Sequence, residues 1–137
     1  MRTLILSFFL LSIPANAAVI KIADISDLNF GSAPQGDGPK TVIASTSENA
    51  TNGSFKVTGN PNVTYTITLP VAPITMTTTG NGIKTISVSS FTSYPANSGL
   101  LDATGQELVF VGATRAALNV AQKTGSYSGS YSVTVVY

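Results

Sequence analysis

The side chains that most often carry out catalysis are scarce in this sequence. It contains no histidine and no cysteine, which excludes histidine acid–base chemistry, cysteine nucleophiles and the common zinc ligand sets. Paired carboxylates remain, because two acids across one cleft can hydrolyse a glycosidic bond. Two pairs lie close in sequence, Asp24 with Asp27 and Asp102 with Glu107. Such spacing is ordinary for solvated loop acids, so we expect no catalytic residues and no enzyme.

Asp102 begins the stretch Asp-Ala-Thr-Gly, residues 102–105, which could also be offered as a calcium site. A calcium loop supplies a run of acidic ligands, and this chain lacks such a run. An aspartate at the start of a turn commonly accepts hydrogen bonds from the backbone of the same turn. We therefore expect Asp102 to cap its own turn, and we expect neither a metal nor a cofactor.

Two tyrosines near the end of the chain, Tyr127 and Tyr131, could form a surface on which a sugar stacks. The alternative is structural, because Tyr131 belongs to a strictly alternating stretch and Tyr127 leads into it. The aromatic and β-branched residues of one parity are Tyr131, Val133, Val135 and Tyr137. A pleated strand would bury this set and expose the serines and threonine between its members. The alternation therefore favours a strand with Tyr131 in the core.

The first residues have the order of a secretory signal peptide. A basic residue, Arg2, precedes an apolar stretch over residues 4–13, a proline, and Ala-Asn-Ala at 15–17. The apolar stretch is too short to span a bilayer, and no second one follows. We expect cleavage after Ala17, an exported domain at residues 18–137 with no transmembrane segment, and a final location in the periplasm, at the cell surface or in an extracellular fibre.

Charge is sparse and scattered along the chain. Lysine and arginine number 7 against 6 acidic residues, and removal of Arg2 with the leader leaves no net charge. Nucleic-acid or anionic-membrane binding would need a basic stripe, so we expect neither. Without disulfides, an exported domain depends on a sizeable apolar core. Low charge with strand-forming composition is typical of chains that either cover their strand edges or associate through them.

Short strand-like segments separated by turn residues cover residues 18–137. We expect two short segments within 20–30, a strand at 41–45, a hairpin over 54–70 with an Asn-Pro-Asn turn, a hairpin over 74–88 with a Gly-Asn-Gly turn, a turn at 102–105 before a strand at 107–111, a short strand at 118–120, and a last strand that reaches Tyr137. Short strands at this spacing predict an all-β antiparallel sandwich in a single domain.

Three motifs resemble one family pattern, in the same order and over nearly all of residues 18–137. They are Leu-x-Phe-Gly at 28–31, Gly-x-Phe-x-Val-x-Gly followed by Tyr-x-Ile-x-Leu within 53–69, and Gly-x-Tyr-x-Gly-x-Tyr-x-Val-x-Val-x-Tyr at 125–137. The pattern resembles the spore coat protein U group and, more closely, its cysteine-free relatives, an uncharacterised family of exported bacterial proteins. Both are similar to the subunits of archaic chaperone–usher pili.

The resemblance implies an immunoglobulin-like sandwich that is incomplete, with a groove where one strand is missing. In such pilins a periplasmic chaperone fills the groove first, and the N-terminal extension of the next subunit then replaces it. The implied partners are a chaperone, an usher and like subunits, and the implied product is a fimbrium or homo-oligomer built by strand addition. The implied groove residues are Tyr131, Val133, Val135 and Tyr137, with the terminal carboxylate as an anchor for the chaperone.

The segment after the leader is the candidate donor extension, through Val19, Ile20, Ile22 and Ile25. These residues do not keep one parity, and a one-residue slip sends every side chain to the opposite face. The segment is therefore either a short donor or the domain's own first strand. Two functions stay open: a structural surface subunit that associates by strand addition, and a self-complete secreted domain that binds carbohydrate or a host surface.

Overall fold

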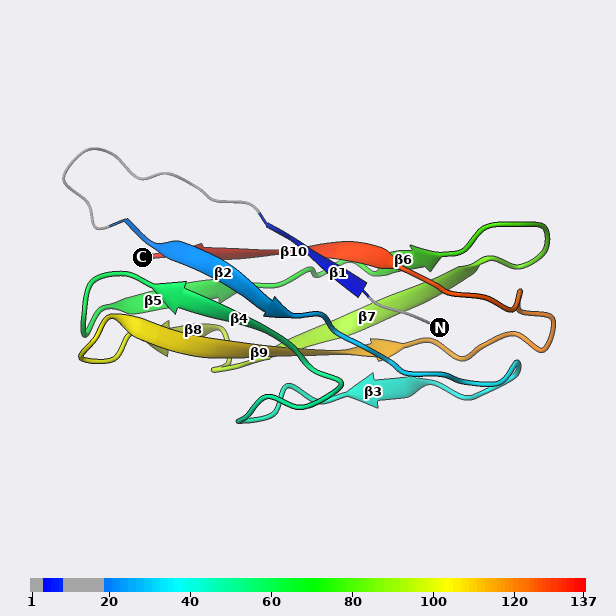
Figure 1. Ribbon diagram of the computed structural model, residues 1–137, viewed down its shortest axis with the longest axis horizontal. Coiled ribbons are helices and arrows are strands. Elements are labelled where there is room, and N and C mark those ends of the chain that lie inside the picture. Colours follow the sequence, from blue (N-terminus) through cyan, green and yellow to red (C-terminus); the bar gives the residue numbers. More distant parts are fainter. Residues whose placement is uncertain (1–3, 9–18) are drawn as a thin grey trace.

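The computed structural model describes residues 4–8 and 19–137. Their regular elements are all strands, and these residues contain no helix that is long and apolar enough to cross a membrane. The strands form two sheets that lie one above the other and curl along the long axis of the molecule (Figure 1). The predicted all-β, sandwich-like fold is confirmed.

The larger sheet is antiparallel and has β9 (Gln106–Arg115) in its middle. Its strand order is β2 (Lys21–Ser26), β4 (Gly53–Thr58), β9, β7 (Thr85–Tyr94) and β6 (Ile74–Thr77). The short strand β3 (Lys40–Val42) pairs with the last residues of β9, beyond the part that pairs with β4. Strand β9 is therefore paired along both edges.

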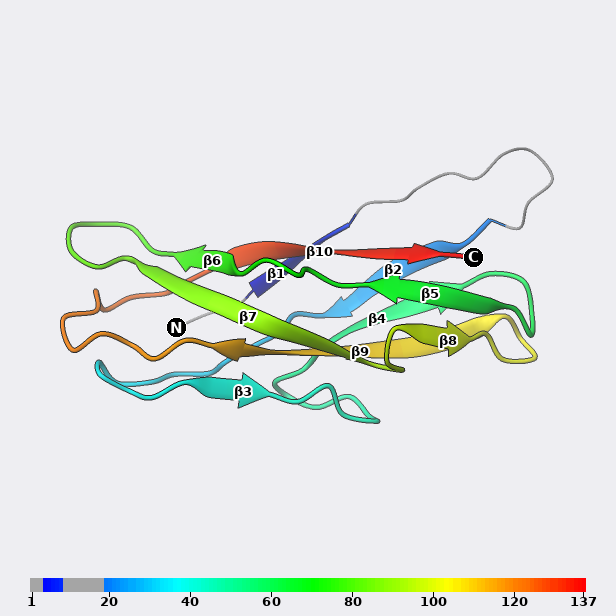
Figure 2. The same cartoon turned by 180° about the vertical axis from the view of Figure 1, so that it is seen from behind.

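The smaller sheet has the order β1 (Leu4–Phe8), β10 (Gly129–Val136), β5 (Thr64–Thr68) and β8 (Ser98–Leu100). Strands β10, β5 and β8 pair antiparallel, whereas β1 runs parallel to β10. Figures 1 and 2 show β1 beside β10 from opposite sides of the molecule. A bridge between Thr77 and Ser128 links β6 to the residue before β10 and so joins the two sheets at this point.

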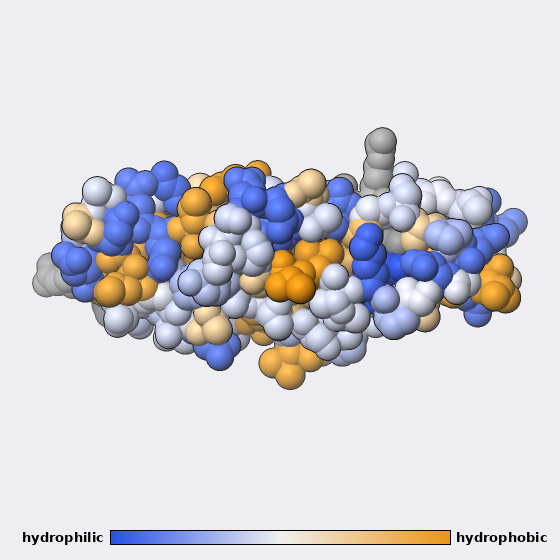
Figure 3. Space-filling model, turned by 90° about the horizontal axis from the view of Figure 1, so that it is seen from below, coloured by the Kyte–Doolittle hydropathy of each residue, from blue (hydrophilic) through white to orange (hydrophobic). Residues whose placement is uncertain are grey.

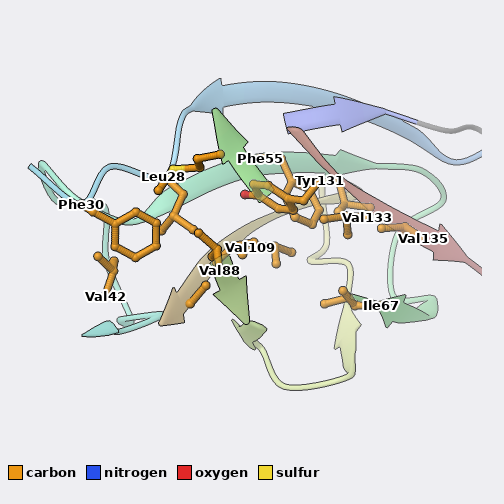
Figure 4. Close-up of a cluster of buried hydrophobic side chains, with 14 of the residues drawn as sticks. Leu28, Phe30, Val42, Phe55, Ile67, Val88, Val109, Tyr131, Val133 and Val135 are labelled. Atoms are coloured by element: carbon orange, nitrogen blue, oxygen red, sulfur yellow. The ribbon is translucent and has the colours of Figure 1, made fainter. Parts of the chain in front are cut away.

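The core lies between the sheets and follows the period of two that each strand carries. Alternate residues face inward, because successive side chains of a strand point to opposite faces. Figure 4 shows β10 contributing Tyr131, Val133 and Val135 to a cluster with Phe55 and Val109 of the larger sheet. The buried residues of the two sheets form one cluster, so the described chain has a single core.

The predicted hairpin over residues 54–70 is wrong. Strands β4 and β5 belong to different sheets, and the turn around Pro61 carries the chain across the core. The alternation was correct for each strand, since Phe55 and Tyr65 are both buried. Their apolar faces meet across the core instead of lying side by side in one sheet. The predicted hairpin over 74–88 is confirmed, with Met76 opposite Ile86.

The predicted strand at residues 118–120 is also wrong. Strand β9 ends at Arg115, and the chain then turns. The backbone N–H of Leu118 donates to the Asp37 carbonyl at 2.7 Å. The side chain of Asn119 accepts a hydrogen bond from the Ala121 N–H at 2.8 Å. The bond at Asn119 is local and competes with strand pairing, while the bond to Asp37 holds Leu118, which is buried, within a loop.

Candidate functional site

The carboxylate of Asp102 is occupied by its own turn. Its Oδ1 accepts hydrogen bonds from the Thr104 hydroxyl at 2.6 Å, the Thr104 N–H at 2.8 Å and the Gln106 N–H at 3.0 Å. The hydroxyl of Thr104, followed by these backbone donors, holds the pKa of Asp102 below its usual range. The predicted capping role of Asp102 is confirmed.

Glu107 ties the two sheets together. Its carboxylate accepts a hydrogen bond at 2.7 Å from the hydroxyl of Tyr65, which lies on β5 of the other sheet. Burial, and then the bond to Glu107, raise the pKa of Tyr65 well above its usual range. Glu107 and Asp102 both border a hollow of about 340 Å³ on the surface, but each carboxylate is already hydrogen-bonded within the fold.

The other acidic pair is exposed. Asp24 lies on β2 and Asp27 follows that strand. Partial burial, and next the Asp27 carboxylate, raise the pKa of Asp24 from its usual value. The part of the chain that the structure describes contains no group of three or more acidic side chains placed to hold a metal ion.

The four residues implied as groove residues lie along one strand and its end. Tyr131, Val133 and Val135 point into the core, and each is at most 2% exposed. Tyr137 is half-buried, and its hydroxyl accepts a hydrogen bond from the Asn60 N–H at 3.0 Å. The end of the chain is therefore attached to the turn between β4 and β5. Since Tyr127 and Tyr131 are both buried, they do not form a sugar-stacking surface.

The two halves of β10 differ in the strands that lie beside them. Its last residues, Thr134 to Val136, pair antiparallel with β5. Its first residues, Gly129 to Val133, pair with β1 in five parallel positions, from Leu4 opposite Gly129 to Phe8 opposite Val133. We call this first half of β10, on the side where β1 lies, the β10 edge. The strand that covers it belongs to the predicted leader.

The hydroxyl of Tyr131 lies deep in the core without a hydrogen-bond partner among the described residues. Burial, followed by the charges of Asp24 and Asp27, raises its pKa well above the usual range. The hydroxyl lies close to the backbone of Gly53 on β4, where an added Cβ would stand 2.8 Å from it. Phe91 packs against the ring, with 5.0 Å between the ring centroids. Tyr131 therefore fixes β10 against the larger sheet.

The candidate donor residues lie on or beside β2. This strand pairs antiparallel with β4, with Ile22 opposite Val57 and an irregularity between Asp24 and Ser26. Ile20 is buried and Ile22 half-buried, whereas Val19 and Ile25 are exposed. In this structure the segment is the first strand of the larger sheet. Its role as a donor to another copy stays a prediction.

A second candidate site, which the sequence did not predict, lies among loops. A cavity of about 390 Å³ is bordered by residues 33–35, Ile86, Leu118 and residues 122–127 apart from Ser126. Arg115, fully buried at the end of β9, anchors one of these loops through an ion pair of 2.6 Å with Asp37. Polar residues in loops have no periodicity, so the sequence pattern gave no signal for this cavity.

Comparison with known proteins assigns a family. A family model described as a domain of unknown function, DUF4402, matches residues 20–137. The chain belongs to the DUF4402 family. No curated protein matches its sequence, and no solved structure matches its fold. The matched range of DUF4402 contains β2 to β10 and therefore both candidate sites, whereas β1 lies outside it.

The surface of the DUF4402 domain has apolar residues in several places. In the view from below, they form separate patches between polar residues (Figure 3). The most exposed large apolar side chains are Val71, Val120, Ile43 and Val19. They belong to four distant stretches of the chain, and singly scattered apolar residues are normal on a protein surface. The β10 edge and the loop cavity are therefore the two candidate functional sites.

Proposed function

We propose that this DUF4402 protein is an exported, non-enzymatic structural subunit of the cell surface. It associates with partner strands by β-strand addition at the β10 edge, in the manner of pilin subunits. The observation that carries the proposal is the parallel pairing of β1 with Gly129 to Val133, because it supports the view that this edge accepts an added strand.

The register of β1 supports the same interpretation. Leu6 stands opposite Tyr131, Ser7 opposite Ser132, and Phe8 opposite Val133. Tyr131 and Val133 are buried, while Ser132 is exposed. A strand added in this register therefore needs apolar residues at every second position to match the core face of β10. Backbone hydrogen bonds would supply affinity, and the alternating side chains would supply specificity.

The strand that covers the β10 edge is not expected to stay there. Residues 4–8 belong to the predicted leader and lie outside the DUF4402 match. Cleavage after Ala17 leaves the first half of β10 without the strand that flanks it. A strand edge of low charge is prone to pair with another chain. A periplasmic chaperone would cover this edge first, and a like subunit delivered through an usher would cover it afterwards.

The end of the chain adds a second point of contact for a chaperone. The hydrogen bond between Tyr137 and Asn60 holds the last residue against the turn after β4. The side chain of Tyr137 is thereby fixed near the end of β10. A partner strand that reaches this end of β10 would contact Tyr137 as well.

The experiment uses the chain exported with its own leader, with the mass of the product showing where the leader is cut. A peptide copying residues 3–10, with lysines added at both ends for solubility, is titrated into the purified protein. The matched controls are two peptides of the same sequence. One is N-methylated at the odd-numbered residues, and the other is N-methylated at the even-numbered residues. N-methylation keeps the side chains but removes donors that strand pairing requires.

We expect the unmodified peptide to bind and to raise the melting temperature of the protein. At least one of the two N-methylated peptides should fail to bind. A monomer that melts cooperatively and ignores the peptide would contradict strand addition. That result would favour the other function left open by the sequence, a self-complete secreted domain that binds a ligand through its loops.

A further inference from the structure

The loop cavity lies at the end of the molecule opposite the C-terminus. Figures 1 and 2 show the C-terminus at one end, and the chain between β9 and β10 together with the β6–β7 turn at the other. The cavity of about 390 Å³ is bordered by this chain, by residues 33–35 and by Ile86 of β7. Its size is within the range of small-molecule sites.

A buried amide side chain forms the polar part of the cavity wall. Gln122 is 5% exposed, and its Nε2 donates to the Ile83 carbonyl at 3.0 Å and to the Tyr127 hydroxyl at 2.9 Å. A contact of 3.2 Å with the Thr85 carbonyl also faces this nitrogen. Because carbonyl oxygens accept only, these contacts fix the orientation of the amide.

The remaining atom of this amide is free to accept a hydrogen bond. Gln122 Oε1 accepts no hydrogen bond from the described residues. It is not among the fully buried polar atoms that lack a partner, which include the hydroxyl of Tyr131. The Tyr127 hydroxyl is engaged by the carbonyl of Lys123 at 2.6 Å, so it holds the loop in place. Because Gln122 borders the cavity, this oxygen is the acceptor that Gln122 can offer to a ligand hydroxyl.

The charge of the cavity is positive. Lys123 borders it, and within the described residues this lysine forms no ion pair. None of the bordering residues is acidic. Apolar surface from Ala33, Pro34, Ile86 and Leu118 makes up much of the rest. The cavity thus combines a cation, a fixed hydrogen-bond acceptor and apolar walls.

We propose that this cavity binds a sugar acid, such as a uronic acid residue of a glycan. The carboxylate pairs with Lys123, a ring hydroxyl donates to Gln122 Oε1, and the C–H face of the ring packs against Ile86 and Leu118. A neutral sugar would leave the cation without a partner, and a simple apolar acid would leave the amide oxygen without a donor. This site goes beyond strand addition and does not depend on it.

The test is an NMR titration of the exported chain with three probes. D-glucuronate carries both recognised groups, D-glucose carries only hydroxyls, and cyclohexanecarboxylate carries only the acid. We expect glucuronate to cause saturable shifts at the amides of residues 33–35 and 118–127, and to bind about five-fold more tightly than either other probe.

Two lysine variants separate recognition from general charge attraction. Lys123→Ala should weaken glucuronate binding about five-fold and leave glucose unchanged. Lys84→Ala removes the same charge from an exposed position of the β6–β7 turn that does not border the cavity, and should change neither. Thr124→Trp, at an exposed position of the rim, should block all three probes while the fold stays intact.

Three results would overturn the proposal: no saturable shift at these amides with glucuronate, equal weakening by the two lysine variants, or cyclohexanecarboxylate binding as tightly as glucuronate. Peptide binding at the β10 edge is measured on the same protein. Failure of one site therefore leaves the result for the other interpretable.

Discussion

Strands β9 and β10 both place alternating valines in the core, yet their surroundings differ. Strand β9 has buried residues on both faces from Val109 to Ala113 and is paired along both edges. Strand β10 buries one face, and among the described residues β1 is the only strand that pairs with one edge of its first half. The two strands therefore differ in side-chain burial and also in the pairing of their backbone edges. The edge pairing makes β9 an internal strand, and it makes β10 the strand at which we propose that a partner pairs.

The largest effect is expected at the end of β9. Arg115 is fully buried, donates to the Ala116 carbonyl at 2.8 Å and pairs with Asp37, whose side chain is 40% exposed. Arg115→Ala should lower the free energy of unfolding by about 3 kcal/mol, because it removes a half-buried ion pair and leaves a void where the buried side chain was. Urea unfolding measures this loss.

Arg115→Met is the matched control, since it fills similar volume without charge. It should cost less than Arg115→Ala, because the half-exposed Asp37 carboxylate can be hydrated when its partner is absent. Equal losses for the two variants would show that the charge, rather than the packing, stabilises this end of β9.

A pair of valine truncations compares the two strands directly. Val109→Ala on β9 and Val133→Ala on β10 each remove methyl groups from fully buried positions, at a cost of about 2 kcal/mol. Only Val133→Ala should also weaken binding of the strand peptide, because Val133 lies where β1 pairs. Equal weakening of peptide binding by both variants would mean that global stability, not the β10 edge, controls it.

Substitutions at the contact between Gly53 and Tyr131 should change stability in opposite directions. Gly53→Ala should destabilise the protein by about 2 kcal/mol, because its Cβ would lie 2.8 Å from the tyrosine hydroxyl. Tyr131→Phe should leave stability unchanged or raise it by about 1 kcal/mol, since the lost hydroxyl has no partner among the described residues. In the double variant, Tyr131→Phe should reverse most of the Gly53→Ala loss. Additive effects would contradict this contact.

The smallest effect is expected at the exposed turn of Asp102. Its folded-state pKa is lowered by Thr104 and Gln106, so its contribution to stability is present above the unfolded pKa and is lost as pH falls through the folded pKa. Asp102→Asn and Thr104→Ala should both lose less stability than the wild type between about pH 6 and about pH 3. Urea midpoints across this range test the sign, and unchanged pH dependence in both variants would contradict it.

The alternation of apolar residues predicted which side chains are buried, but it did not predict which strands are neighbours. On β10, Tyr131, Val133 and Val135 are buried as expected. The same rule applied to β4 and β5 found their inward faces and still produced a false hairpin, because a short turn can connect two sheets as readily as two paired strands. Strand β8 was missed, since the three residues Ser98–Leu100 carry too little pattern to identify a strand.

The candidate sites were predictable to different degrees. The residues of β10 were predicted from their alternation and from the resemblance to pilins. Which strand pairs with each edge of β10 could not be predicted, because it depends on the strand order of the sheet. The loop cavity could not be predicted, because Gln122 and Lys123 lie in a polar loop and meet Ile86 only through the tertiary fold. Asp102 could be assigned, since its hydrogen bonds stay within five residues of sequence.

Hydrogen exchange of backbone amides tests the central claim most directly. In the exported chain without peptide, the amides of Val109 to Ala113 on β9 should exchange slowly, and some of those between Gly129 and Val133 should exchange quickly. Addition of the strand peptide should slow the fast β10 amides and leave β9 unchanged. Slow exchange along the whole of β10 in the free protein, with no response to peptide, would show that the edge is already covered and would contradict strand addition.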